Sequence, residues 1–141
     1  MQKQLDSKKM EPLVSLTIRD RDQVFRPGDD LHIEFQIDAV QENEVQAIEA
    51  SVLWFTEGKG DEDLGVHEFH RFVPSDLDDG ELRQLQRLSV KLPNSPLSYE
   101  GMIVKIHWCV RVRAFLRRGR EVCFEQPFQL GSVPPAQLEM V

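Results

Sequence analysis

Apolar residues alternate with polar residues along most of this chain of 141 residues. In an extended strand, such alternation places apolar side chains on one face and polar side chains on the other, which is typical of half-buried antiparallel strands. The pattern predicts seven strands, within residues 14–18, 31–37, 48–55, 66–72, 88–92, 104–112 and 122–128. Seven strands in one domain of this size predict an all-β fold, an antiparallel β-sandwich.

Turn-forming residues separate the predicted strands. Proline and glycine in 26–29, 93–96 and 117–120 mark tight turns, and the last of these predicts a hairpin with Gly119 in the left-handed region. Leucines three residues apart also fit a short helical turn within residues 77–88. We expect the sandwich to span residues 11–131, between mobile tails at 1–10 and 132–141.

One residue of each alternating pair is expected to face the core. We expect Trp54 and Trp108 to be the largest core side chains. The predicted core consists of Val14, Leu16, Ile18, Leu31, Ile33, Phe35, Ile37, Ile48, Ala50, Val52, Trp54, Val90, Ile106, Trp108, Val110, Val112, Phe124 and Phe128.

Several short motifs, in their order and spacing, resemble the arrestin family. The first half has residues 24–29 (VFRPGD) between two strands, followed by 48–54 (IEASVLW). The second half has 92–96 (LPNSP), 98–101 (SYEG) and the strand 103–112. The resemblance covers residues 13–130.

The resemblance implies an immunoglobulin-like sandwich of arrestin type, used as an adaptor or scaffold and not as an enzyme. Arrestins have two such domains, and this chain has room for one. The polar core that arrestins build between domains therefore has no counterpart here, and no functional residue carries over. A lone domain of this family is also expected to be able to form a homodimer, at the face of Leu53 and Phe55 or at an uncovered edge strand.

Composition and motifs exclude several classes of function. The net charge of −7 argues against a nucleic-acid binder. No apolar run reaches the roughly 20 residues of a transmembrane helix, and residues 1–12 do not resemble a secretory signal, so we expect a cytoplasmic protein. Nucleophile, phosphate-loop and dinucleotide motifs do not occur, and we expect neither an enzyme nor a cofactor.

Basic residues gather in one predicted hairpin. Residues 103–120, called the basic hairpin below, contain no acidic residue and six basic ones: Lys105, Arg111, Arg113, Arg117, Arg118 and Arg120. One interpretation is a surface that binds an acidic or phosphorylated protein segment. The other is cross-strand pairing of Arg111 and Arg113 with Glu121 and Glu125, which would leave Arg117 and Arg118 at the loop tip without an obvious partner.

Acidic residues occur in two loops, at Asp61, Glu62 and Asp63 and at Asp76, Asp78 and Asp79. Calcium needs six to eight oxygen ligands, which loops at one end of a sandwich could supply. The two loops flank one predicted strand, however, and are expected at its opposite ends. We therefore interpret them as solvated loops.

Histidines and cysteines are further candidates for metal-binding or catalytic groups. His67 and His70 are three apart in a predicted strand, where they are expected on opposite faces, so no metal site is predicted. Cys109 and Cys123 are not expected to lie directly opposite each other, and we predict neither a disulfide nor thiol catalysis.

The sequence thus predicts a non-catalytic module that binds a protein partner of unknown identity through a sheet edge or the basic hairpin. The alternative is a β-sandwich that binds calcium, a carbohydrate or a lipid.

Overall fold

A computed structural model describes residues 11–38 and 41–132. Within these residues the chain forms nine strands and two 3₁₀ turns. The strands are β1 (Leu13–Ile18), β2 (Val24–Phe25), β3 (Asp30–Asp38), β4 (Val45–Gly58), β5 (Leu64–Phe72), β6 (Gln86–Lys91), β7 (Tyr99–Glu100), β8 (Val104–Leu116) and β9 (Glu121–Leu130). The 3₁₀ turns are η1 (Pro74–Asp76) and η2 (Arg117–Gly119).

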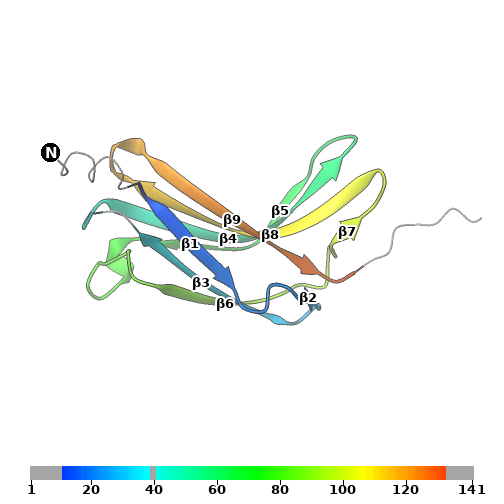
Figure 1. Cartoon of the computed structure of the whole chain (residues 1–141), viewed down its shortest axis with the longest axis horizontal. Helices are drawn as coiled ribbons and strands as arrows, with labels where there is room; N and C mark the ends of the chain where they lie inside the picture. Colours follow the sequence, from blue (N-terminus) through cyan, green and yellow to red (C-terminus); the bar gives the residue numbers. More distant parts are fainter. Residues whose placement is uncertain (1–10, 39–40, 133–141) are drawn as a thin grey trace, which may run out of the picture.

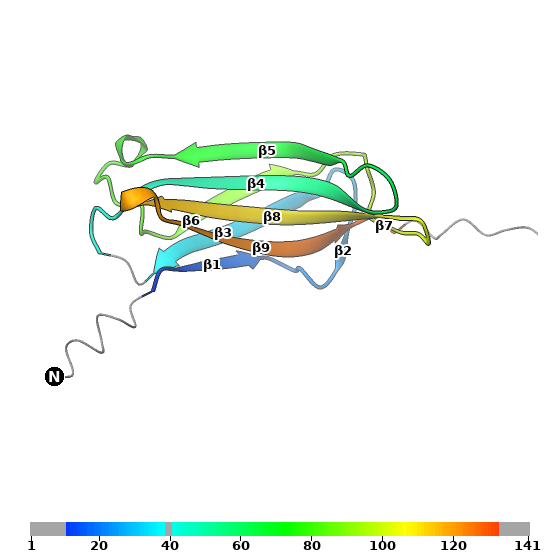
Figure 2. The same ribbon diagram turned by 90° about the horizontal axis from the view of Figure 1, so that it is seen from above.

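The strands form two sheets that pack face to face (Figure 1). The small sheet has three strands in the order β1-β3-β6. The large sheet has six strands, in the order β2-β9-β8-β4-β5 with β7 also paired to β8 (Figure 2). All of these pairings are antiparallel except that of β2 with β9. The predicted all-β antiparallel sandwich is therefore confirmed.

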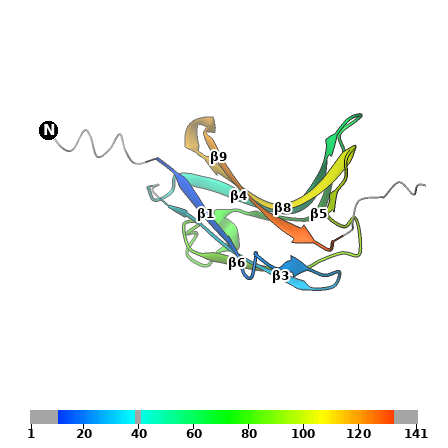
Figure 3. The same cartoon turned by 45° about the vertical axis from the view of Figure 1, so that its right-hand side comes forward.

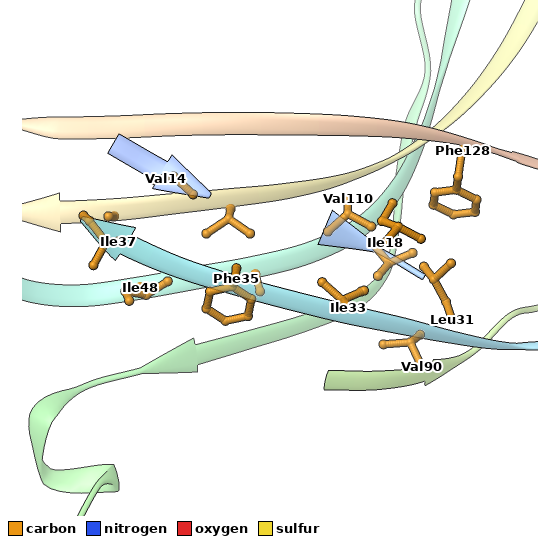
Figure 4. Close-up of a cluster of buried hydrophobic side chains, with 14 of the residues drawn as sticks. Val14, Ile18, Leu31, Ile33, Phe35, Ile37, Ile48, Val90, Val110 and Phe128 are labelled. Carbon is orange, nitrogen blue, oxygen red and sulfur yellow. The ribbon is translucent and has the colours of Figure 1, made fainter. Parts of the chain in front are cut away.

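Apolar side chains from both sheets meet between the layers (Figure 4). The small sheet contributes alternate residues of β3, from Leu31 to Ile37, and the large sheet contributes alternate residues of β8, from Trp108 to Leu116. The indole N–H of Trp108 donates a 2.7 Å hydrogen bond to the carbonyl of Pro96. The largest core side chain is thus buried without leaving its polar atom unsatisfied.

Each of the seven predicted strands matches a strand of the structure. The two-residue strands β2 and β7 were not predicted, because they are too short to show a period. The helical turn considered for residues 77–88 is absent: η1 ends at Asp76, and the following residues form irregular turns until β6 begins at Gln86. Leu82 is nevertheless buried in the core.

Four predicted core residues are less buried than expected. Leu16, Trp54 and Ile106 are only partly buried, and Phe124 is exposed. Trp54 is near the end of β4 and Ile106 is near the start of β8. This end of the large sheet bends away from the small sheet (Figure 3). Leu16 is on β1, a border strand of the small sheet, and Phe124 is on β9, next to the border strand β2. Leu16 and Trp54 nevertheless pack against the buried core.

The predicted tails lie outside the described residues, except for Ser132. Of the two residues proposed for a dimer face, Leu53 is buried, opposite Cys109 on the outer face of the curved large sheet, and Phe55 is partly buried. In the part of the chain that the structure describes, no helix is long and apolar enough to cross a membrane.

The core predicts a large difference between two leucines of the small sheet. Leu31 on β3 is 0% exposed, whereas Leu13 on β1 is 58% exposed. Leu31→Ala should lower the free energy of unfolding by about 2–5 kcal/mol, because it leaves a cavity. Leu13→Ala should change it by no more than about 0.5 kcal/mol. Urea denaturation followed by tryptophan fluorescence measures both, and equal losses would contradict the described packing.

Candidate functional site

The tip of the basic hairpin is the turn η2 with Arg120, between β8 and β9. The backbone N–H of Leu116 donates to the carbonyl of Arg120 at 2.8 Å, which closes the turn. Glu44, in the connection before β4, holds it from outside. Its carbonyl accepts a 3.0 Å hydrogen bond from the Arg117 N–H, and its carboxylate pairs with the Arg120 guanidinium. The tip is therefore fixed by contacts with a distant part of the chain.

Two successive residues of the turn have left-handed backbone conformations. Gly119 has a φ of 71°, as the sequence predicts, and Arg118 has a φ of 67°. A residue with a side chain pays roughly 1–2 kcal/mol for this conformation, so the surrounding contacts must hold it. The backbone thereby fixes the direction in which Arg118 leaves the turn.

Four of the six basic residues are paired with carboxylates. Arg111 lies 3.2 Å from Glu125, and Arg113 lies 2.8 Å from Glu121. Both pairs follow from the register of β8 with β9 and confirm the predicted cross-strand pairing. Arg120 pairs with Glu44, and Lys105 lies 3.7 Å from Glu100.

The six basic residues do not form one patch. Lys105 is near the start of β8, and Arg117 follows its end. At about 3.4 Å per residue, the two ends of this strand are roughly 40 Å apart. The guanidinium groups of Arg111 and Arg113 lie on the outer face of the large sheet, next to their glutamates. Only Arg117, Arg118 and Arg120 come together.

These three arginines line an open hollow of about 460 Å³, with Gln41, Glu42 and Glu44. Arg117 and Arg118 form no ion pair with any residue in the described ranges, in contrast to Arg120. After the Arg120–Glu44 pair is set aside, the hollow contains two guanidinium groups and the carboxylate of Glu42. The lining that remains is therefore more basic than acidic, with two guanidinium groups against one carboxylate.

A second hollow of about 300 Å³ shares Arg117 with the first and is also lined by Glu81. The Arg83 guanidinium hydrogen-bonds Glu81 at 2.7 Å and, with the Arg83 backbone N–H, lowers the pKa of this carboxyl to about 2. Glu81 is thus ionised at neutral pH and already paired with Arg83. It competes only weakly for Arg117.

The acidic loops lie at opposite ends of β5, as the sequence predicts. Asp76 accepts a hydrogen bond from the Val73 N–H at 2.8 Å, and Asp79 accepts one from the Glu81 N–H at 3.0 Å. These carboxylates therefore help to shape their own loop. Across residues 11–38 and 41–132, the structure brings no three carboxylate, histidine or cysteine side chains into a group that could hold a metal ion.

The placement of His67 and His70 differs from expectation. A bulge in β5 changes its register with β4 between Val52 and Leu53, so both imidazoles face the small sheet. His67 donates to the carbonyl of Lys91 at 2.7 Å, and His70 donates to the carboxylate of Glu68 at 2.9 Å. Each ring has its own partner, and the pair forms no chelate.

Cys109 and Cys123 are free thiols, and β8–β9 pairing places neither opposite the other. Cys109 is buried, and burial together with the nearby charge of Glu125 raises the pKa of its thiol to about 12. Cys123 is an exposed residue, but its thiol is partly desolvated. This desolvation and the nearby charge of Glu125 raise the pKa of the Cys123 thiol. Neither thiol is activated as a nucleophile.

Comparison with known proteins supports the fold. No family model and no curated protein matches the sequence. Among solved structures, the chain is similar to Spo0M, a sporulation control protein from Bacillus subtilis, with a TM-score of 0.61 and 9% sequence identity. The similarity covers 86% of this chain and 50% of that chain, so this chain spans about half the length of Spo0M. At this identity the likeness shows the fold alone, an arrestin-like β-sandwich.

The two thiols should react very differently. At pH 8, iodoacetamide should modify Cys123 in the native protein and leave Cys109 intact, because Cys109 is buried and its pKa is raised to about 12. Modification of Cys123 should become faster as the pH rises, since its raised pKa leaves little thiolate at pH 8. Peptide mass spectrometry assigns the sites, and the protein unfolded in guanidinium, modified at both, is the control. Native labelling at Cys109 would contradict the described burial.

Proposed function

We propose that this chain is a non-catalytic protein-interaction module of the cytoplasm, an adaptor or scaffold, that binds an acidic or phosphorylated segment of a partner at Arg117 and Arg118. One observation carries the proposal. Four basic residues of the hairpin are engaged by carboxylates, whereas these two line an open hollow without an ion pair to any described residue.

The chemistry of the tip suits a phosphate group or a carboxylate. A guanidinium presents a planar fork of donors that binds either anion through two parallel hydrogen bonds. Glu42 lines the same hollow and reduces its positive potential. A phosphorylated side chain, with a charge of about −1.5 to −2, overcomes this repulsion better than a single carboxylate does. A phosphorylated segment is therefore the favoured partner.

Two further findings support a regulatory function in the cytoplasm. The similar protein Spo0M is described as a sporulation control protein, which fits a regulatory function of the shared fold. The two thiols are free, which is compatible with a reducing compartment such as the cytoplasm.

Charge reversal at the tip tests the proposal. Arg117→Glu/Arg118→Glu should weaken binding of the partner at least tenfold, because charge-assisted hydrogen bonds contribute about 1.5–3 kcal/mol each and 1.4 kcal/mol corresponds to tenfold. Partners are captured from native lysate and identified by mass spectrometry. Their acidic segments are then synthesised with and without phosphate, and binding is measured by fluorescence anisotropy.

The matched control is Lys59→Glu/Lys105→Glu. It changes the net charge by the same amount at the other end of β8, where Lys59 donates its backbone N–H to Ile103 at 3.3 Å. The control should bind like the wild type. A partner that binds the tip variant as tightly as the wild type would place the interaction elsewhere and contradict the proposal.

A further inference from the structure

The strand β5 forms one border of the large sheet (Figure 2). Within the described part of the chain its only strand neighbour is β4. One side of β5 therefore presents backbone N–H and C=O groups that no other described strand pairs. Such an edge is a template for pairing with another extended strand.

The outer face of β5 carries three exposed apolar side chains beside Arg71. Leu64 is 56% exposed, Val66 is 54% exposed and Phe69 is 52% exposed. Their cross-strand neighbours on β4 are Phe55, Leu53 and Ser51, which face away from the small sheet. Edge strands that avoid association usually carry charged residues at such positions.

We propose that β5 pairs antiparallel with β5 of a second copy of this chain, about a two-fold axis that passes beside Phe69. The two large sheets then join into one continuous sheet. The inference is independent of the partner site at the hairpin tip, which lies between β8 and β9. What selects a second copy is that the sequence of β5 is complementary to itself in this arrangement.

Charge complementarity is the first part of the argument. With Phe69 opposite Phe69 of the second copy, Glu68 lies opposite His70 of the second copy, and His70 lies opposite Glu68. The side chains of Glu68 and His70 are 40% and 43% exposed and hydrogen-bonded within one strand at 2.9 Å. Two copies would join them into a ladder of alternating carboxylates and imidazoles.

The neighbouring arrangements lack this match. An axis beside Glu68 places two glutamates directly opposite each other, and an axis beside His70 does the same with two histidines. Like charges in direct opposition weaken a strand pair, and neither of these axes places a carboxylate opposite an imidazole. The charges of the strand therefore favour the axis beside Phe69, which also brings the two exposed phenylalanine rings together.

The bulge in β5 fits the same arrangement. Val66 and His67 together face one residue of β4, Leu53. If Val66 and His67 together also face one residue of the second copy, that residue is Arg71. Arg71 of one copy then lies opposite Val66 of the other on the outer face. Phe72 then lies opposite Gly65 on the inner face. Every residue from Gly65 to Phe72 then lies opposite a residue that points to the same face of the joined sheet.

Sedimentation velocity between 1 and 100 µM tests the proposal. The wild type should be a dimer at the upper end of this range. Phe69→Lys should raise the dimer dissociation constant at least tenfold, because it places two lysines together at the axis. Leu13→Lys, a change at a similarly exposed residue on the edge strand β1, is the control and should leave the dimer intact. Arg117→Glu/Arg118→Glu should also leave it intact, which separates this test from that of the partner site.

Charge exchange tests the ladder. Glu68→Lys should weaken the dimer, because lysine then lies opposite His70. The double variant Glu68→Lys/His70→Glu should restore it, since each lysine lies opposite a glutamate. Circular dichroism shows that each variant is folded before its dissociation constant is compared.

Single cysteines test the register. In a Cys123→Ser background, Phe69→Cys should form a disulfide dimer under mild oxidation, because directly opposite Cα atoms lie about 4.5–5.5 Å apart. Glu68→Cys and His70→Cys should crosslink far less, since each would be offset from its own copy by two residues. A wild type that stays monomeric at 100 µM, a dimer indifferent to Phe69→Lys, or preferential crosslinking at 68 or 70 would overturn the proposal.

Discussion

The structure depends on the contact between the alternating apolar faces of β3 and β8, which hold the two sheets together. The sheets differ in width, with three strands against six. The small sheet can therefore cover only part of the large one. The ends of β4 and β8 and the border strand β5 extend beyond this cover (Figures 1 and 3). Surface available for interaction arises at these uncovered positions because the core does not use them.

The antiparallel register of β8 and β9 decides which charges of the basic hairpin remain available. From Trp108 to Phe115, each residue of β8 faces a residue of β9. This places Arg111 opposite Glu125, and it places Arg113 opposite Cys123, diagonal to Glu121, with which Arg113 pairs. Turn residues have no cross-strand position opposite them. Arg117 and Arg118 therefore have no cross-strand glutamate, because they lie in the turn. Arg120 instead pairs with Glu44, from the connection before β4.

The seven main strands and most of the core follow from the sequence, because alternation is a local pattern that burial of one face requires. The Arg111 and Arg113 pairs follow as well, since one hairpin sets their register. The bulge at His67, the burial of Leu53 and the partial exposure of Trp54 do not follow. They depend on how two sheets of unequal width curve around each other. The hollow at the tip also depends on Glu42 and Glu44, which lie more than 70 residues away in the chain and show no local signal.

The two proposed surfaces constrain each other through geometry. The hairpin tip lies at the end of the large sheet where β5 ends at Phe72, because β4 pairs with both β5 and β8. In an antiparallel β5 pair, the two tips therefore point toward opposite ends of the joined sheet. One short partner segment cannot reach both tips, and dimer formation alone adds no affinity for it. A partner with two acidic segments gains from the dimer only if the linker between them spans the joined sheet. The dimer would thus select partners by the spacing of their acidic segments, and the arginines would select them by charge.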